Sequence, residues 1–146
     1  MKGTREDIDR APALGCRIGR AYQIMLSQLA AALKEADLDI TTSEYLVLRA
    51  VYSSPGLQQC EIAEMVGKDK AAICRCVAGL EKKDMVSTVT VSHKCLKVYP
   101  TSKARDIEPA IMDVATKRHQ ALMDLTTPEN LAIFSEIIDK IIKENR

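Results

Sequence analysis

Aromatic side chains are scarce in this chain of 146 residues: they make up 3% of it, and tryptophan is absent. Modules that bind single-stranded nucleic acids stack successive bases on aromatic rings, so this composition disfavours them. The six glycines occur only singly, and no glycine-rich phosphate-binding loop can be built from them. The nucleophile-elbow pattern Gly-x-Ser-x-Gly and the zinc-protease pattern His-Glu-x-x-His are missing too. We therefore expect a protein that is not an enzyme.

Residues that bind metals are also few. The two histidines, His93 and His119, are not accompanied by the Cys-x2-Cys or His-x3-His spacings of zinc sites. We expect neither a metal site nor a cofactor. The odd number of cysteines and their irregular spacing argue against a disulfide framework, so we expect reduced thiols. The cysteines are Cys16, Cys60, Cys74, Cys76 and Cys95.

Long hydrophobic runs are missing as well. Charges interrupt every apolar run well before the roughly 18 residues that a transmembrane helix needs. The start of the chain carries acidic side chains and leads into no apolar segment, which argues against a secretory signal. With 47% hydrophobic and 28% charged residues, the composition is that of a folded protein. We expect one domain, alone or with an appended dimerisation element, in the cytoplasm and without a membrane partner.

The net charge of +1 conceals an uneven distribution along the chain. Residues 1–40 are neutral, residues 41–105 carry a net charge of +4, and residues 106–146 carry −3. Within the middle block, residues 67–105 hold nine basic and three acidic side chains. Such a local excess indicates an anionic partner for one segment, and the alternative is a solvated helix face.

Helical spacing of apolar residues predicts four helices in the first part of the chain. Thr42 is a suitable N-cap for the second of them, and the turn-forming segment Ser53–Gly56 ends it. Gly67 closes the third. We expect these helices to span about residues 14–36, 42–53, 58–66 and 69–83.

After Asp84 the apolar period changes from 3.6 to two, and β-branched residues dominate. This pattern predicts a hairpin with strands at 86–91 and 96–99 and a four-residue tip at 92–95. Three short helices followed by a hairpin are typical of a winged helix-turn-helix. We therefore expect a mainly α fold with a small β-hairpin, in which residues 39–105 form a DNA-binding domain.

Two further helices are expected after the hairpin. Thr101 can cap the first, and Pro109 inside it predicts a kink or a restart. Thr127 followed by Pro128 predicts the start of the last helix. The first and last helices of the chain carry wide apolar faces that one small domain would struggle to cover. We expect them to form a homodimer, and the alternative is that they pack together within one chain. The dimerisation regions would be 1–38 and 106–146.

The helix predicted at about 69–83 has one apolar and one basic face. On a wheel of 100° per residue, Val77 and Leu80 lie within about 40° of Ile73 and form the buried edge. The opposite face is basic or small, which suits a recognition helix that approaches base edges in the major groove. Arg75 can bind guanine or a phosphate with two hydrogen bonds. The outward residues are Ala71, Arg75, Ala78 and Lys82.

Several segments together resemble the MarR family of transcriptional regulators. They are Thr42–Leu48, Ile62–Gly67, Asp69–Ile73 with Arg75, and Leu80–Val86. The resemblance covers about residues 40–105 by motif, and the flanking helices match the family's dimerisation region by position and character. It implies a homodimer that binds a pseudo-palindrome in double-stranded DNA as a repressor or an activator, and we expect a repressor. It also implies a small-molecule effector that binds between the dimerisation and DNA-binding regions and alters DNA affinity.

The resemblance and the charge pattern together assign candidate site residues. Arg75, Lys70 and Ala71 would face the major groove, with Ala72 and Cys74 beside them. Gln58 and Lys68 would contact phosphates. Lys94 and Lys97 would contact DNA from the hairpin, near His93. The candidate effector-binding residues are Tyr22, Met25, Tyr45 and Leu48.

The sequence departs from the family pattern at the positions that read DNA. Ala71 and Ala72 stand where the family usually has serine or threonine, and Cys74 stands where threonine is common. Asp84 replaces the usual glycine before the hairpin, and the hairpin lacks the usual Asp-Arg-Arg. We therefore expect base readout to depend on Arg75 and the lysines, without an arginine in the minor groove.

Two alternative functions remain open at this point. Cys16 lies beside Arg17 and one turn before Arg20, and cationic neighbours lower the pKa of a thiol, which would suit a redox-responsive regulator of the same fold. The alanines of the recognition helix and the depleted hairpin would suit a winged helix that has lost DNA binding and binds a protein instead. Steep salt dependence of binding would distinguish DNA recognition from protein docking.

Overall fold

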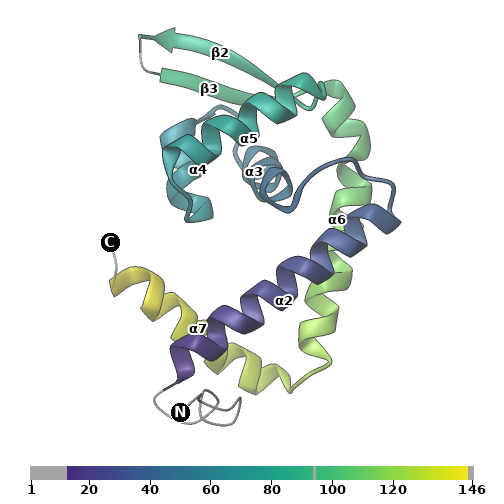
Figure 1. Cartoon of the computed structure of the whole chain (residues 1–146), viewed down its shortest axis with the longest axis vertical. Coiled ribbons are helices and arrows are strands. Elements are labelled where there is room, and N and C mark those ends of the chain that lie inside the picture. Colours follow the sequence, from purple (N-terminus) through teal and green to yellow (C-terminus); the bar gives the residue numbers. More distant parts are fainter. Residues whose placement is uncertain (1–12, 94, 145–146) are drawn as a thin grey trace, which may run out of the picture.

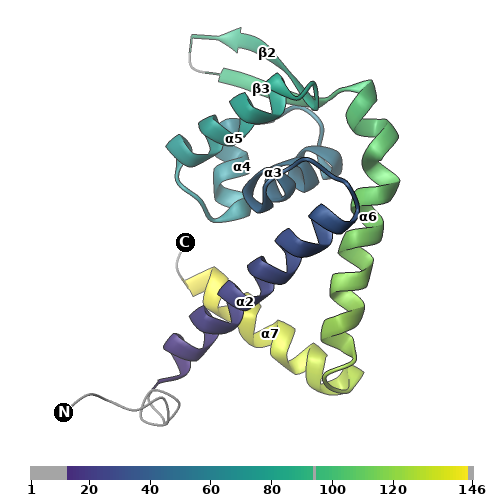
Figure 2. The same ribbon diagram turned by 45° about the vertical axis from the view of Figure 1, so that its right-hand side comes forward.

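The computed structural model describes residues 13–93 and 95–144, which form helices with one small sheet (Figure 1). The order is α2, Leu14–Glu35; α3, Thr42–Ser53; β1, Leu57–Gln58; α4, Gln59–Val66; α5, Lys70–Lys82; β2, Val86–Ser92; β3, Cys95–Pro100; α6, Ser102–Met123; and α7, Pro128–Glu144. In both ribbon views the hairpin, α3, α4 and α5 gather at one end, and α2, α6 and α7 extend away from it (Figure 2). The predicted mainly α fold with a small hairpin is confirmed.

The N-cap of α3 is one residue earlier than the sequence suggested. Thr41, and not Thr42, is the N-cap: its hydroxyl accepts a hydrogen bond from the Glu44 amide at 3.0 Å. The Glu44 carboxylate in turn accepts one from the Thr41 amide, also at 3.0 Å. Either threonine could cap a helix, but only Thr41 has a glutamate three residues later, and this reciprocal capping box decides the boundary.

The helix-turn-helix proper is formed by α4 and α5. Gly67 ends α4 in the left-handed conformation, with φ of 73°, which glycine adopts without steric cost. Asp69 then caps α5, because its carboxylate accepts a hydrogen bond from the Ala72 amide at 2.7 Å. The predicted boundaries of both helices are confirmed to within one or two residues.

The sheet contains one strand that the sequence did not predict. The two-residue β1 pairs with β3, so that the sheet has the order β1-β3-β2. The expected four-residue hairpin tip was wrong, because Ser92 pairs with Cys95 and the strands therefore continue into it. A register shift between Thr90 and Ser92 accompanies this pairing. Periodicity alone cannot detect a strand as short as β1 or pairing across a bulge.

The two last helices begin as expected, but α6 does not restart. Thr101 caps α6 and Thr127 caps α7, through hydrogen bonds from the amides of Ala104 and Asn130. Pro109 lies within α6, which continues unbroken to Met123. Proline removes one backbone hydrogen bond, here the one to the carbonyl of Arg105. Both residues are exposed, so water can satisfy that carbonyl and the helix tolerates the loss.

The hydrophobic core lies mainly within the helix-turn-helix and the first half of α6. Its fully buried side chains come from α2, α3, α4, α5, β3 and α6, and include Val47, Ile62, Ile73, Val98 and Ile111. Tyr52 connects α3 to the start of α6, because its hydroxyl donates a hydrogen bond to the carbonyl oxygen of Ala104. The guanidinium of Arg105 lies 5.9 Å from the centre of the Tyr52 ring.

Replacing Tyr52 with phenylalanine should lower the free energy of unfolding by about 1 kcal/mol, because the hydrogen bond to Ala104 is lost while the ring stays. Burial, with the Glu108 carboxylate as a lesser cause, raises the pKa of Tyr52 to about 12. The wild-type protein should therefore lose part of its stability as the pH rises from about 10 to 12. Tyr52→Phe should lack that part in denaturant titrations at pH 8 and pH 11, and an equal pH dependence of both proteins would contradict the assignment.

The terminal helices leave most of their apolar residues exposed. In α7 no residue is buried, although its apolar side chains lie mainly along one side of the helix. In α2 only Leu29 and Leu33 are buried. The exposed large apolar residues on the two helices are Leu14, Ile18, Tyr22, Ile24, Met25, Ile133, Phe134, Ile137, Ile141 and Ile142. Within the described residues, no helix is long and apolar enough to cross a membrane.

Candidate nucleic-acid interface

The two faces of α5 are those that the helical wheel predicted. Ile73, Val77 and Leu80 are at most 2% exposed and pack into the core. The four outward residues, Ala71, Arg75, Ala78 and Lys82, are all exposed. The exposed stripe therefore presents two cationic side chains separated by methyl groups, with no bulky residue to prevent close approach to a DNA groove.

The N-terminal end of α5 is flanked by lysines. Lys70 is the first residue of the helix and is exposed, and Lys68 in the preceding turn is half-buried. The Asp69 cap uses the Ala72 amide, so this amide is already hydrogen-bonded within the chain. Phosphate binding at this end would therefore depend on the two lysine side chains and the other free amides of the first turn.

Cys74 is a residue of α5 that contacts α4. It is half-buried, and its thiol donates a hydrogen bond to the side-chain carbonyl oxygen of Gln59 at 3.0 Å. Sequence reasoning did not single out Gln59, because nothing in its local pattern indicates a contact with a residue fifteen positions later. On the same helix, burial raises the pKa of the Cys76 thiol, and the Glu44 carboxylate adds to this rise. Cys76 is therefore less reactive than an ordinary thiol.

The pairing of β1 with β3 brings Gln58 and Lys97 together on one face of the sheet. Lys97 lies directly opposite Gln58 of β1 on one side and Val89 of β2 on the other. Side chains at directly paired positions lie on the same face of a sheet. Val98, the next residue on β3, points to the opposite face of the sheet and is fully buried. Lys97 and Gln58 therefore lie on the face directed away from the core. Two of the predicted DNA contacts are therefore neighbours in space.

The tip of the hairpin is polar and partly outside the described residues. His93 is exposed. Lys94 lies outside the described residues, so its predicted contact with DNA stays a prediction. Val89 and Val91 on β2 are 49% and 59% exposed, so the outer part of the hairpin also offers apolar side chains.

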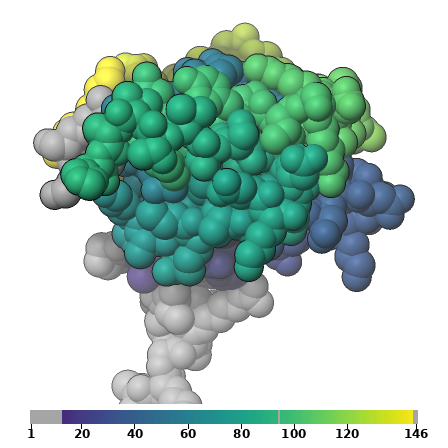
Figure 3. Space-filling view, turned by 90° about the horizontal axis from the view of Figure 1, so that it is seen from above, coloured from purple at the N-terminus to yellow at the C-terminus, as the bar shows by residue number. Residues whose placement is uncertain are grey.

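The helix and the hairpin form one side of the molecule. In Figures 1 and 2, α5 runs beside β2 and β3, and its first turn lies at the same side as the hairpin tip. Seen from above in Figure 3, the teal surface of α4, α5 and the hairpin covers the middle of this face, and the green surface of α6 lies at its edge. Most of the basic segment 67–105 is thus gathered on one side of the molecule.

The four candidate effector-binding residues lie in two different environments. Tyr45 and Leu48 are buried in the core of α3, and the Tyr45 hydroxyl accepts a hydrogen bond from Arg49 at 3.1 Å. Tyr22 and Met25 are exposed on α2. Neither of two surface clefts that the structure contains is lined by any of these four residues.

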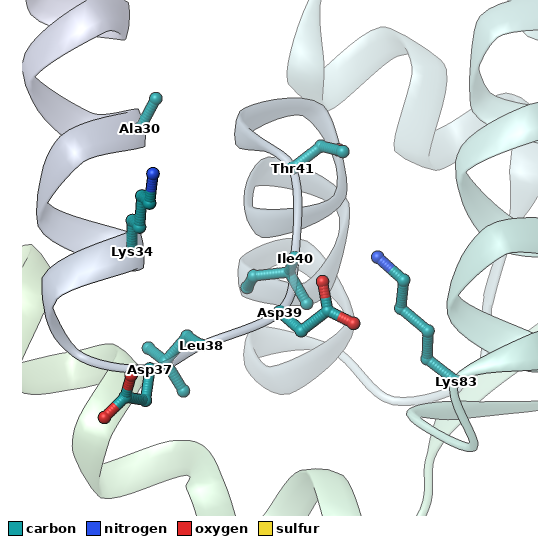
Figure 4. Close-up of a pocket in the computed structure, with 8 residues that line it drawn as sticks. All are labelled: Ala30, Lys34, Asp37, Leu38, Asp39, Ile40, Thr41 and Lys83. Atoms are coloured by element: carbon teal, nitrogen blue, oxygen red, sulfur yellow. The ribbon is translucent and has the colours of Figure 1, made fainter.

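The larger cleft, of about 440 Å³, lies where α2 meets the helix-turn-helix. Figure 4 shows Lys34 on α2, Asp39 on the connecting segment and Lys83 just after α5, with the Asp39 and Lys83 side chains directed toward one another. The Lys83 amine also forms an ion pair of 2.7 Å with Glu44. The residues that line the cleft are Ala30, Lys34, Asp37, Leu38, Asp39, Ile40, Thr41 and Lys83. The smaller cleft, of about 260 Å³, lies on α2 beside Arg17 and Arg20.

Cys16 is exposed near the start of α2, and it lies about 160° around the helix axis from Ile18 of the apolar face. Arg17 follows it in the sequence, and Arg20 lies one turn further on. The redox role predicted for Cys16 from these neighbours stays a prediction.

A helix-turn-helix with an exposed basic second helix, completed by a hairpin on the same side, defines a winged helix-turn-helix DNA-binding protein. Comparison with known proteins agrees with this class. A model of the MarR family matches residues 38–93, which include α3, α4, α5 and β2, the first strand of the hairpin. The resemblance seen in the sequence is thereby confirmed: over residues 38–93 the chain is similar to the MarR family of transcriptional regulators.

Related proteins extend the match beyond the helix-turn-helix. The chain is 26% identical over 109 residues to the uncharacterized HTH-type transcriptional regulator YybA of Bacillus subtilis (strain 168), and the match covers 73% of each chain. A MarR protein from Peptoclostridium difficile DA00132 superposes with a TM-score of 0.82 at 18% identity, over 99% of this chain and 92% of that one. Bordetella bronchiseptica BpsR, whose DNA binding is regulated by 6-hydroxynicotinic acid, superposes with a TM-score of 0.77 at 15% identity, over 90% and 95%.

Proposed function

We propose that this protein is a homodimeric, sequence-specific regulator, acting as a repressor, that binds a pseudo-palindrome in double-stranded DNA and is tuned by a small ligand. The observation that carries the proposal is the exposed stripe of α5, where Arg75 lies between two alanines on the basic side of the molecule. An arginine on a recognition helix can hydrogen-bond the O6 and N7 atoms of guanine. Lys70 and Ala71 would lie beside it in the major groove, bordered by Ala72 and Cys74.

The remaining contacts would position the protein on the DNA backbone. Lys68 and Gln58 would bind phosphates on either side of the groove, and Lys97 would do so from the hairpin together with Lys94. Such contacts fix register and orientation without reading sequence. The residues that lie beside Arg75 on α5 are the uncharged Ala71, Ala72 and Cys74, and the hairpin sequence contains no arginine. Arg75 would therefore be the main source of base preference.

The exposed apolar faces of α2 and α7 support the dimer. A contiguous apolar surface of this kind on a protein marks an interaction site. We propose that a second copy of the chain covers this surface. A two-fold axis through residues 1–38 and 106–146 would place the two recognition helices in major grooves about one helical turn of DNA apart.

Ligand control is supported by a relative and by the position of the larger cleft. BpsR shares this fold, and a small molecule regulates its DNA binding. The cleft beside Lys34, Asp39 and Lys83 lies between α2 and the end of α5, where a bound molecule would contact both α2 and the end of the recognition helix. Tyr22, Met25, Tyr45 and Leu48 remain the candidate residues for an effector that enters between α2 and α3.

Selection from a random pool of duplexes tests the proposal directly. The purified chain is used at moderate salt with a reductant, and the bound duplexes are sequenced. Recovery of a two-fold symmetric site, with half-sites about one helical turn apart, is the expected result. If no sequence is enriched and binding to any duplex stays weak at low salt, the proposal is wrong and a protein partner becomes the better explanation. A repeat with an oxidant tests the cysteines.

Replacing Lys97 with alanine should weaken binding to all duplexes by a similar factor, because we propose that this lysine contacts a phosphate from the outer face of the sheet. The slope of log affinity against log salt should fall by about one. Lys117→Ala is a matched control, since Lys117 is an exposed lysine on α6 that pairs with Asp113. A loss confined to the selected site, or an unchanged salt slope, would show that Lys97 has another role.

A further inference from the structure

A single charged side chain, Glu44, lies in the core of the described residues. It is 6% exposed, whereas the other core residues are hydrophobic. Burial of a carboxylate is costly unless hydrogen bonds and a counter-charge compensate for it. The position of Glu44 therefore requires an explanation beyond the general need to fill the core.

Helix capping explains only part of the environment of Glu44. Its Oε1 atom accepts the hydrogen bond from the Thr41 amide that completes the capping box of α3. Glu61 has the same role at the start of α4, where its carboxylate accepts a hydrogen bond from the Gln58 amide, and Glu61 is exposed. A capping glutamate can thus remain in water, and the burial of Glu44 must come from another element.

That element is the recognition helix α5. The Lys83 amine, immediately after the helix, binds Oε1 of Glu44 at 2.7 Å. One turn earlier, Gly79 lies so near that a Cβ atom added to it would be only 2.5 Å from Oε2. A side chain at position 79 would force the Glu44 carboxylate to shift away from α5 and would disturb its two Oε1 hydrogen bonds. The second half of α5 is therefore held against Glu44 by a close contact at Gly79 and an ion pair at Lys83.

The same contacts determine the direction in which Arg75 points. Arg75, Gly79 and Lys83 are four residues apart in sequence, so each lies about 40° around the helix axis from the next. A shift or rotation of α5 at Gly79 would therefore move Arg75 relative to the DNA. The Lys103 amine also donates a hydrogen bond to the Lys83 carbonyl at 2.9 Å, which fixes the end of the helix.

We infer that Glu44, Gly79 and Lys83 are positioning residues that set the rotation of α5 and so direct Arg75 at base edges. This inference rests on the proposed function and adds the determinants of its specificity. The buried carboxylate is then retained because it defines one position of the recognition helix, a role that buried ionic groups have in some proteins. A hydrophobic residue at position 44 could fill the core but could not hold the Lys83 amine.

The test compares Gly79→Ala and Lys83→Met with the wild-type protein. For each, the ratio of affinities for the selected site and for an unrelated duplex is measured at one salt concentration, after correction for the folded fraction. We expect the ratio to fall at least fivefold in both variants, which is the lower part of the effect of losing one arginine–base contact. Lys82→Met is the matched control: it removes an exposed lysine one position away and should lower both affinities while the ratio stays within twofold.

Combination with Arg75→Ala separates positioning from simple loss of stability. If the variants act through Arg75, Gly79→Ala should change the ratio less than twofold once Arg75 is absent. A lower unfolding midpoint with an unchanged ratio would mean that the contact is only structural and would overturn the inference. An equal loss with and without Arg75 would also overturn it. If the wild-type protein itself does not discriminate between duplexes, the proposed function fails first. Should Gly79→Ala not fold, Lys83→Met alone decides between these outcomes.

Discussion

Replacing Arg75 with alanine should weaken binding to the selected duplex by about 1–3 kcal/mol, or roughly 5- to 150-fold. Arg75 is exposed at the centre of the outward stripe of α5, and its neighbours on that stripe, Ala71 and Ala78, cannot hydrogen-bond to bases. The preference for one base pair in each half-site should therefore relax. Competition titrations with duplexes substituted at single positions measure both effects.

A control separates base readout by Arg75 from its charge. Lys82→Ala removes a cation from the same exposed stripe, near the end of α5. It should weaken the selected and the unrelated duplexes by similar factors, as the loss of a phosphate contact does. If Arg75→Ala behaves in this same way, or leaves affinity and preference untouched, another face of the domain reads the DNA.

Placing an aspartate at Ile137 should produce a monomer and lower the affinity for a symmetric site by roughly 100-fold or more. Ile137 is 49% exposed on the apolar side of α7, where a second chain would bury it. A charge buried without a partner opposes association strongly. When the two recognition helices are no longer linked, each half-site is bound separately, and the gain from bivalent binding is lost.

Sedimentation measures the oligomeric state of this variant, and titration of full and half sites measures its binding. Ala132→Asp adds the same charge about 140° away around α7, on the side that carries Glu136 and Lys143, and should leave the dimer intact. Affinity for an isolated half-site should change little in either variant, since α7 is far from α5 in both ribbon views. A wild-type protein that sediments as a monomer, or an Ile137→Asp variant that remains dimeric, would contradict the proposed interface.

Much of the fold followed from local signals in the sequence. Gly67 and Asp69 mark the end of α4 and the start of α5 by chemistry that acts within three residues. The outward face of α5 followed from helical period alone, because a helix that packs against a core must bury one side. These features depend on neighbouring residues, and they were predicted correctly.

The features that sequence reasoning missed depend on residues far apart in the chain. The pairing of β1 with β3 joins segments about forty residues apart, and the contact between Cys74 and Gln59 joins two helices. The role of Glu44 is of the same kind, since its sequence context indicates only a helix cap, while its burial comes from Gly79 and Lys83. The candidate DNA contacts could be named from charge and period, but how α5 is held in place could not.

The short strand β1 has a mechanical consequence for recognition. Gln58 is both the last residue of a strand bonded to the hairpin and the cap of α4, so no flexible linker separates the hairpin from the helix-turn-helix. The distance between the hairpin and the recognition helix is then nearly constant. When a duplex does not match that distance, the DNA must change its groove width or bend, and the energy of that deformation depends on base sequence. Positions that no side chain touches can in this way contribute to the choice of operator.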